Sequence, residues 1–308
     1  MNSIKRYYDL GTFLKEHFPF KVQKLTLNAG FTCPNRDGFK GRGGCTYCNN
    51  QTFSPAFQRT PDRITTQLQK GTHFFAHKYP NMRYLAYFQS FSNTYAPLAV
   101  LKEKFEEALR FPGVVGLIIA TRPDCVADDV LDYLGQLAKH TFILIEYGIE
   151  STSDQTLQRI NRGHNYAEAV DAIKRSHDRG IMTGAHVIMG LPGEQQTEMI
   201  ARAKQLSALP LTTLKLHQLQ LIKGTRMAKQ YQEEPFPLFS ADDYIALVCE
   251  FLTHSRPDLV MDRFVSQSPK ELLFTPGWGL KNYEFTAKVD QRLQQLDLYQ
   301  GCRYTPLQ

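Results

Sequence analysis

The sequence predicts an α/β fold, a partial (βα)6 TIM-like barrel that carries a small α+β extension at its C-terminal end. Three observations support this prediction. Six short apolar runs alternate with amphipathic helical patterns up to residue 221 of the 308-residue chain, which is typical of a parallel β/α array. Several runs are almost continuously apolar, as parallel strands covered on both faces are. Beyond about residue 230 this alternation stops.

The six candidate strands are short, apolar and separated by helical patterns. They are Lys24–Asn28, Arg83–Gln89, Val115–Thr121, Phe142–Gly148, Ile181–Met189 and Thr213–Leu221. After the fourth strand, Thr152 with Gln155 and then Asn165 with Glu168 have the spacing of helix capping boxes. Because crossovers between parallel strands are right-handed, the array is expected to curl into a barrel or partial barrel.

The chain divides into a core, residues 1–230, and an extension, residues 231–308. Pro235 and Pro237 mark the start of the extension. It contains a helix around Asp242–His254, a strand-like segment at Val260–Val265 and a final helix that ends near Leu298. These elements are too few for an independent core, so we expect the extension to pack on the barrel.

Composition is that of a globular protein of a reducing compartment. Hydrophobic residues make up 42% of the chain and charged residues 21%. The N-terminus lacks a signal-peptide pattern, and the most apolar stretch is far too short to span a membrane. We therefore expect a cytoplasmic protein with no membrane partner. The net charge of +6 permits RNA as a partner, and it equally suits a basic enzyme that binds no nucleic acid.

Three cysteines stand out in the segment that follows the first predicted strand. Cys33, Cys45 and Cys48 form a C-x11-C-x2-C pattern within residues 30–50. Thiolates are soft ligands that suit zinc, copper(I) or iron–sulfur clusters. A structural zinc site normally takes four protein ligands. Three cysteines on a [4Fe–4S] cluster would leave one iron open for chemistry.

Polar residues gather at the carboxyl ends of the predicted strands, where parallel β/α folds place their sites. They are Gln89–Thr94 after the second strand, Thr121–Asp124 after the third, Glu146, Gly148 and Glu150 on the fourth, His186 and Gly190–Glu194 on and after the fifth, and Lys215, His217 and Gln218 on the sixth. The cysteine loop opens on the same edge. Packing alone does not explain so many polar groups at the open end of the barrel, where the carboxyl ends of the strands meet.

These segments together resemble radical SAM enzymes of the YhcC/YtqA-like family, which is related to the radical SAM core of Elp3-type proteins. The resemblance rests on KLTLNAGFTCPNRDGFKGRGGCTYCN, YFQSFSNTYAP, ATRPDC, IEYGIES, GLPGE and LKLHQLQLIKGT, and extends to YQGCRY near the end. It implies a barrel of the radical SAM type, S-adenosylmethionine (SAM), and a [4Fe–4S] cluster held by Cys33, Cys45 and Cys48. The eleven-residue first spacing, in place of the common C-x3-C-x2-C, belongs to this family.

The resemblance also implies the chemistry and two of the residues near the cofactor. SAM would chelate the open iron, and an electron from the cluster would cleave SAM to a radical that abstracts hydrogen from a substrate. Tyr47 would pack near the SAM adenine. Gln89 and its neighbours occupy the place of the motif that holds the SAM amino group. The barrel mouth would keep the radical from water.

Four further positions follow from the same resemblance. Glu146 and Ser151 would lie near the ribose or the methionine of SAM. The segment from Ile188 to Gly190 resembles the fifth-strand backbone that meets the adenine. None of these roles follows from composition or spacing.

The same resemblance, with the basic charge, implies a tRNA wobble uridine as substrate, on which a carboxymethylaminomethyl group would become aminomethyl, with flavodoxin or ferredoxin as reductant. The first alternative is a radical SAM enzyme that acts on a small metabolite or a porphyrin. The second is a non-catalytic module that binds zinc and RNA, in which His164 or His186 is the fourth zinc ligand beside the three cysteines. The chain has no room for the acetyltransferase domain that follows the Elp3 core.

Several other residues allow two interpretations. Cys125 is either a thiol at the barrel mouth or a small buried residue, and Cys249 is expected in the core. His186 and His217 are either substrate contacts or hydrogen-bonded core residues. The cations of the cysteine loop are either solvated or phosphate-binding; they are Arg36, Lys40 and Arg42. The loop around Trp278 is either an RNA contact or a packed turn.

Overall fold

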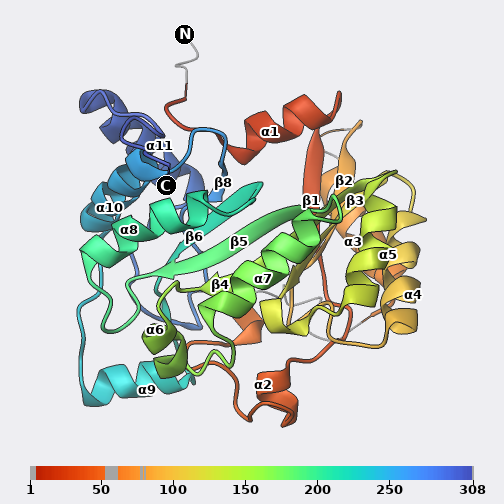
Figure 1. The fold of residues 1–308 in the computed structure, drawn as a ribbon, viewed down its shortest axis with the longest axis horizontal. Helices are drawn as coiled ribbons and strands as arrows, with labels where there is room; N and C mark the ends of the chain where they lie inside the picture. Colours follow the sequence, from red (N-terminus) through yellow and green to blue (C-terminus); the bar gives the residue numbers. More distant parts are fainter. Residues whose placement is uncertain (1–4, 53–61, 77–78, 80, 307–308) are drawn as a thin grey trace.

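The computed structural model describes residues 5–52, 62–76, 79 and 81–306. Its central feature is one parallel sheet of seven strands in the order β1-β2-β3-β4-β5-β6-β8. Helices cover the outer face of this sheet (Figure 1). The predicted α/β partial barrel is therefore confirmed, with a seventh strand in addition to the six expected.

The strands match the predicted runs within two residues at most ends. They are β1 (Val22–Leu27), β2 (Arg83–Phe88), β3 (Val114–Thr121), β4 (Phe142–Glu150), β5 (Met182–Met189), β6 (Thr213–Gln218), β7 (Leu221–Ile222), β8 (Val260–Arg263) and β9 (Leu273–Thr275). The sixth predicted run is divided, because the chain leaves the main sheet after Gln218 and β7 pairs antiparallel with β9.

The helices connect successive strands, as expected for parallel β/α units. They are α1 (Leu10–His17), α2 (Pro34–Asp37), α3 (Ile64–Ala76), α4 (Leu98–Leu109), α5 (Asp128–Ala138), α6 (Asp154–Arg159), α7 (Tyr166–His177), α8 (Gln196–Ser207), α9 (Arg226–Glu233), α10 (Ala241–His254) and α11 (Asn282–Gln295). None of the helices in the described ranges is long and apolar enough to cross a membrane.

One of the two predicted capping boxes is present. At the start of α7, Asn165 Oδ1 accepts from the Glu168 backbone nitrogen at 2.8 Å, and Glu168 Oε2 accepts from the Asn165 nitrogen at 2.7 Å. The box predicted for Thr152 and Gln155 is wrong. Ser153 is the N-cap of α6 and accepts from Thr156, so the helix begins one residue later than the spacing suggested.

The extension joins the core directly, because β8 pairs with β6 and completes the main sheet. Helix α10 packs between α8 and α11. Trp278 lies in a packed turn, where its ring stacks on Phe285 and its Nε1 donates to the Phe239 carbonyl at 3.1 Å. This contact favours the packed turn over an RNA contact at Trp278. The boundary at residue 230 stays a prediction.

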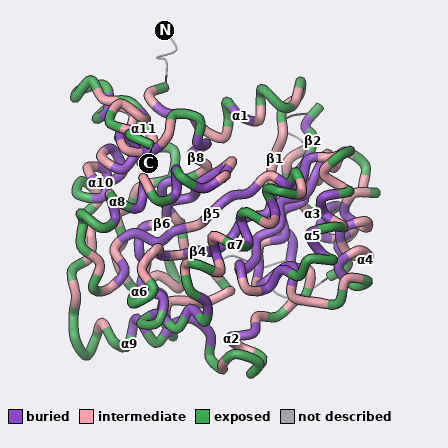
Figure 2. The backbone as a smooth tube through the Cα atoms, viewed as in Figure 1, coloured by how far each residue is buried: buried purple, intermediate pink, exposed green. Residues whose placement is uncertain are grey.

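Inside the curl of the sheet, the side chains form layers, as in other β/α barrels. The lowest layer is apolar, and Phe13 of α1 packs there against Leu144 and other inward-facing residues. Above it, Lys24 of β1 and Asp262 of β8 meet at 2.5 Å, although these strands occupy opposite edges of the sheet. This contact demonstrates the curl. The larger apolar core lies between the sheet and the outer helices, where the strands are buried (Figure 2).

Candidate functional site

A pocket opens above the charged layer, at the carboxyl ends of the strands. Cys33, Cys45 and Cys48 all line it. So do four of the residues predicted to contact SAM, which are Tyr47, Gln89, Glu146 and Ile188. The fold therefore brings the three thiols together with side chains from β2, β4 and β5, which are separated from them by up to 155 residues (188 − 33).

The cysteine loop turns sharply and wraps around one arginine. Cys33 is the N-cap of the short helix α2, and the chain then turns back through several glycines. Gly44 has φ of 78°, and a Cβ there would lie only 3.0 Å from Arg36 Nε, so this position needs glycine. Arg36 donates to the Cys48 carbonyl at 2.9 Å. Its guanidinium thus stays beside the thiols.

Two distant helices hold the loop in place. The Thr46 nitrogen donates to the Ile160 carbonyl at the end of α6, at 2.9 Å. The Met227 nitrogen of α9 donates to the Thr46 carbonyl at 2.9 Å, and Arg226 donates to the Gly44 carbonyl at 2.7 Å. Figure 1 shows α2, α6 and α9 at the same edge of the molecule. The cysteines are therefore positioned by the surrounding protein.

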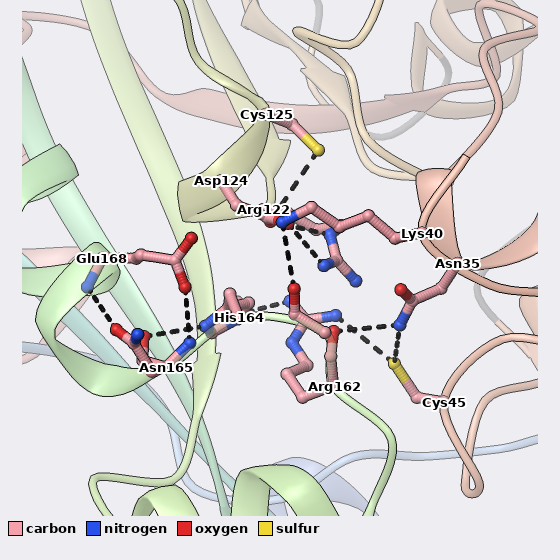
Figure 3. A network of polar contacts seen from close by, with 12 residues as sticks. Asn35, Lys40, Cys45, Arg122, Asp124, Cys125, Arg162, His164, Asn165 and Glu168 are labelled. Atoms are coloured by element: carbon pink, nitrogen blue, oxygen red, sulfur yellow. Dashed lines mark hydrogen bonds and ion pairs between the residues drawn. The ribbon is translucent and has the colours of Figure 1, made fainter.

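Cys45 accepts two side-chain hydrogen bonds (Figure 3). Asn35 Nδ2 lies 3.7 Å and an Arg162 guanidinium nitrogen 3.6 Å from Cys45 Sγ. Arg162 also donates to the Gly148 carbonyl at 2.5 Å and lies 3.5 Å from Glu150 Oε1. These donors favour negative charge on sulfur.

Burial and the neighbouring Cys45 raise the pKa of Cys48 to about 11. Without metal, this thiol is therefore protonated at neutral pH. Metal ligation requires the thiolate, so binding of a metal would release a proton here.

The floor of the pocket is a buried ionic network centred on Glu146. Its Oε2 lies 2.6 Å from Lys215 Nζ and 2.9 Å from His186 Nε2, and its Oε1 lies 3.7 Å from Lys24 Nζ. Lys215 also donates to the Tyr87 hydroxyl at 3.0 Å. Burial alone would raise the pKa of Glu146, but Lys215, Lys24 and His186 hold it well below its usual range. Glu146 is therefore ionised, and protein cations already contact its carboxylate.

Ser151 and Gly190 do not line the pocket. Ser151 is buried, donates to Glu194 at 2.5 Å and accepts from Arg202 at 3.1 Å. Gly190 has φ of 88° and faces the ring of Phe239. The predicted SAM contacts of Ser151 and Gly190 stay predictions.

Two cations of the cysteine loop have partners within the protein. Arg36 contacts Cys48, and Lys40 lies 2.6 Å from Asp124 Oδ2. Arg122 also binds Asp124, at 2.7 Å. Burial would raise the pKa of Asp124, but Arg122 and Lys40 lower it to about 2. Lys40 and Arg42 are both exposed, and of the three loop cations Arg42 is the one with no hydrogen-bond or ion-pair partner among the described residues, so the phosphate-binding interpretation stays open mainly for Arg42.

The remaining cysteines and the two candidate zinc ligands are engaged elsewhere. Burial and Asp124 raise the pKa of Cys125 to about 12, and this thiol does not line the pocket. Cys249 is buried in α10, as expected. His164 Nε2 lies 3.3 Å from the Gly148 carbonyl, and His186 contacts Glu146.

Among the described residues, no three His, Cys, Asp or Glu side chains converge as the ligands of a single ion would. The cysteines of an iron–sulfur cluster ligate different irons and need not converge on one point.

Four arginines line the pocket, and sequence patterns singled out only one of them as a possible ligand contact. They are Arg36, Arg122, Arg162 and Arg263. Arg122 was noted only as part of a polar strand end. Arg162 follows α6, and Arg263 ends β8, which local patterns assigned to the extension. Each of these arginines lies beside the strand ends in the folded protein, which could have marked it as a pocket residue. Using that information requires knowledge of the order of the strands in the sheet.

Comparisons with known proteins agree with this geometry. The family model described as the radical SAM superfamily matches residues 32–206, and the radical SAM C-terminal domain matches residues 211–295. The chain is 39% identical to YtqA of Bacillus subtilis over 300 residues, 97% of this chain and 93% of that protein. It is 34% identical to YhcC of Escherichia coli K12, over 92% of this chain and 91% of that protein.

Solved structures show the same fold at low sequence identity. Elp3 of Methanocaldococcus infernus, with an N-terminal deletion, superposes with a TM-score of 0.68 at 15% identity, over 92% of this chain and 65% of that one. HydG, a maturase of the [FeFe]-hydrogenase, gives 0.58 at 13% identity, over 88% of this chain and 56% of that one. The chain thus spans about two thirds or less of these larger proteins.

Proposed function

The chain belongs to the radical SAM superfamily, and on this basis we propose that Cys33, Cys45 and Cys48 hold a [4Fe–4S] cluster with one open iron. The pocket beside them would bind SAM. The observation that carries this proposal is that all three thiols of one loop line a single pocket at the carboxyl ends of the strands. When bound, the cluster supplies the electron for reductive cleavage of SAM, which starts hydrogen abstraction from a substrate.

The residues present suit these groups. Three soft thiolates match iron, and the cations of Arg36 and Arg162 would offset the negative charge of a thiolate-ligated cluster. Tyr47 offers an aromatic ring, and Gln89 an amide, to the same pocket. The surrounding strands and loops limit access of water to the reacting groups. A reductant such as flavodoxin or ferredoxin would deliver the electron.

Replacing Arg162 with glutamine is expected to lower the reduction potential of the cluster. The guanidinium hydrogen-bonds to Cys45 Sγ at 3.6 Å and stabilises the more negative, reduced form. A charge-assisted hydrogen bond worth about 1–2 kcal/mol corresponds to a shift of roughly 40–90 mV for one electron. A redox titration followed by electron paramagnetic resonance measures the shift. Arg159→Gln on the neighbouring helix is the control, and equal potentials in both variants would contradict the prediction.

We further propose a tRNA wobble uridine as the substrate, with conversion of carboxymethylaminomethyl to aminomethyl as the net change. Elongator complex protein 3 of mouse is 27% identical over 46% of this chain, and tRNA uridine(34) acetyltransferase of Methanocaldococcus infernus is 23% identical over 44%. The net charge of +6 suits an RNA partner. Such a substrate would place the enzyme in the cytoplasm.

An exposed aromatic ring beside the pocket supports an RNA partner. Phe39, in the cysteine loop, is 77% exposed, and its ring lies 6.4 Å from that of Tyr95. Arg42 is exposed in the same loop. Exposed rings next to cations bind unstacked bases in single-stranded RNA, and an anticodon loop offers such bases.

Deleting the gene is expected to change the modification profile of tRNA. The carboxymethylaminomethyl nucleoside should accumulate, and the aminomethyl nucleoside and any product made from it should disappear. Mass spectrometry of tRNA nucleosides measures both species. Wild-type protein, but not the Cys45→Ala variant, should restore the profile. An unchanged profile in the deletion strain would contradict the tRNA proposal and favour a small metabolite or a porphyrin as substrate.

A further inference from the structure

The pocket has a second half, formed by β6, β8 and the segment after β8. Residues from this half include His217, Gln220, Arg263, Ser266 and Ser268. It lies within the region matched by the radical SAM C-terminal domain, residues 211–295. The three cysteines come from a different part of the chain, the loop that follows β1.

Two polar groups in this second half lack partners. His217 Nε2 is shielded from solvent, and no described residue accepts from it or donates to it. Arg263 lines the pocket and forms no hydrogen bond or ion pair within the described ranges. A buried imidazole nitrogen without a hydrogen-bond partner destabilises the protein. A ligand that supplies an acceptor would remove this destabilisation.

Both groups can donate to the same kind of partner, Arg263 always and His217 in its Nε2–H tautomer. Burial, together with unfavourable electrostatic interactions with His186, Arg263 and Lys215, keeps the pKa of His217 well below its usual range. The ring is therefore neutral and carries one N–H. The guanidinium of Arg263 has only donors. Glu146 is the carboxylate that acts on the pKa of His217. It is already bound by His186 and Lys215.

The charge of Arg263 is also unmatched in the pocket. Three other cations that line the pocket have carboxylate partners, and a fourth, Arg36, donates to the Cys48 carbonyl. Arg122 binds Asp124, Arg162 faces Glu150, and Lys215 binds Glu146. Among the described residues, Arg263 is the one pocket-lining arginine with no hydrogen-bond or ion-pair partner in the protein. The second half of the pocket is therefore electrostatically suited to an anion.

We propose that Arg263 and His217 bind a carboxylate group of the substrate. Arginine binds carboxylates with two parallel hydrogen bonds, and the Nε2–H tautomer of His217 would donate a third. The inference rests on the proposed function, in which this carboxylate is that of the carboxymethylaminomethyl arm. Its role is to orient that arm in the pocket. A phosphate of the same RNA is the other anion that this pair of donors suits, and the test separates the two.

The test compares two anticodon stem-loops, one with carboxymethylaminomethyluridine and one with aminomethyluridine at the wobble position. Their affinities for the anaerobically reconstituted protein are measured by fluorescence anisotropy without reductant, so that no turnover occurs. We expect Arg263→Gln to weaken binding of the carboxymethylaminomethyl form about tenfold or more, and to leave the other form unchanged. Lys270→Gln is the matched control, since Lys270 is an exposed cation of the same extension outside the pocket, and it should change neither affinity.

Two outcomes would overturn the inference. Equal losses for both stem-loops would show that Arg263 contacts a phosphate, and no loss for either would show that it binds no anion of the substrate. Arg263 is exposed, so its replacement should leave the fold intact, which circular dichroism checks.

A smaller probe separates this inference from the tRNA proposal. N-ethylglycine carries a secondary amine and a carboxymethyl group, and ethylamine lacks the carboxylate. We expect N-ethylglycine, but not ethylamine, to shift the imidazole resonances of His217 in wild-type protein and not in Arg263→Gln. This result together with an unchanged tRNA profile would retain the carboxylate site and reject tRNA. The absence of any shift, with a changed tRNA profile, would retain tRNA and reject the site.

Discussion

Replacing Cys45 with alanine is expected to abolish both the iron–sulfur cluster and the reductive cleavage of SAM. Two thiols cannot replace three as ligands of a cluster with one open iron. The substitution removes only one sulfur atom from a buried position and is expected to cost about 1 kcal/mol of stability, so the protein should still fold. Iron content should fall from about four per chain toward background. Release of 5′-deoxyadenosine after addition of dithionite should fall with it.

Cys302→Ala is the matched control for this experiment. Cys302 is a free, half-buried cysteine near the C-terminus and does not line the pocket. Its replacement should preserve both iron content and SAM cleavage. Retention of a full cluster by Cys45→Ala would contradict the assignment of the ligands. A colourless wild-type protein with one equivalent of zinc would contradict the cluster itself.

Replacing Lys215 with methionine is expected to lower the free energy of unfolding by about 3–5 kcal/mol, because it leaves buried carboxylates without their main cation. Lys215 lies 2.6 Å from Glu146 and 3.4 Å from Asp262, and all three side chains are at most 4% exposed. After the replacement, Lys24 and His186 would offset only part of the negative charge of Glu146 and Asp262. Methionine keeps the length of the side chain, so the effect reports charge and not a cavity. Denaturant unfolding of the anaerobic protein measures it.

The control is Lys229→Met on helix α9. Lys229 forms an exposed pair with Glu233 at 3.7 Å, with side chains 77% and 65% exposed. An exposed pair of this kind contributes less than about 1 kcal/mol. Similar losses for Lys215→Met and Lys229→Met would show that the buried network does not stabilise the barrel.

Short-range sequence patterns predicted the strands and one helix start, because these features depend on residues that are close together in the sequence. The strands follow from continuous apolar runs, and the Asn165–Glu168 box follows from residues three positions apart. The polar strand ends and the cysteine loop pointed to a site at one edge of the sheet. Seven of the nine residues predicted to hold the cluster or contact SAM line the pocket together, including all three clustered cysteines and Tyr47.

Contacts between distant segments could not be predicted in the same way. Lys24 and Asp262 are separated by 238 residues, and nothing in either strand indicates that the sheet edges approach each other. For the same reason, Val260–Val265 was assigned to the extension, although β8 belongs to the main sheet. The hydrogen bonds from Asn35 and Arg162 to Cys45 also depend on how loops meet, which periodicity does not encode.

The anchoring of the cysteine loop has a consequence for how the protein matures. Backbone and side-chain hydrogen bonds from Arg226 and Met227 help hold the loop at Gly44 and Thr46. During synthesis, these anchors leave the ribosome about 180 residues after the last cysteine of the loop, since 226 − 48 is 178. A nascent chain that ends before α9 has the thiols without their full scaffold. We therefore expect efficient cluster insertion after translation, into a loop whose conformational entropy has already been reduced by folding.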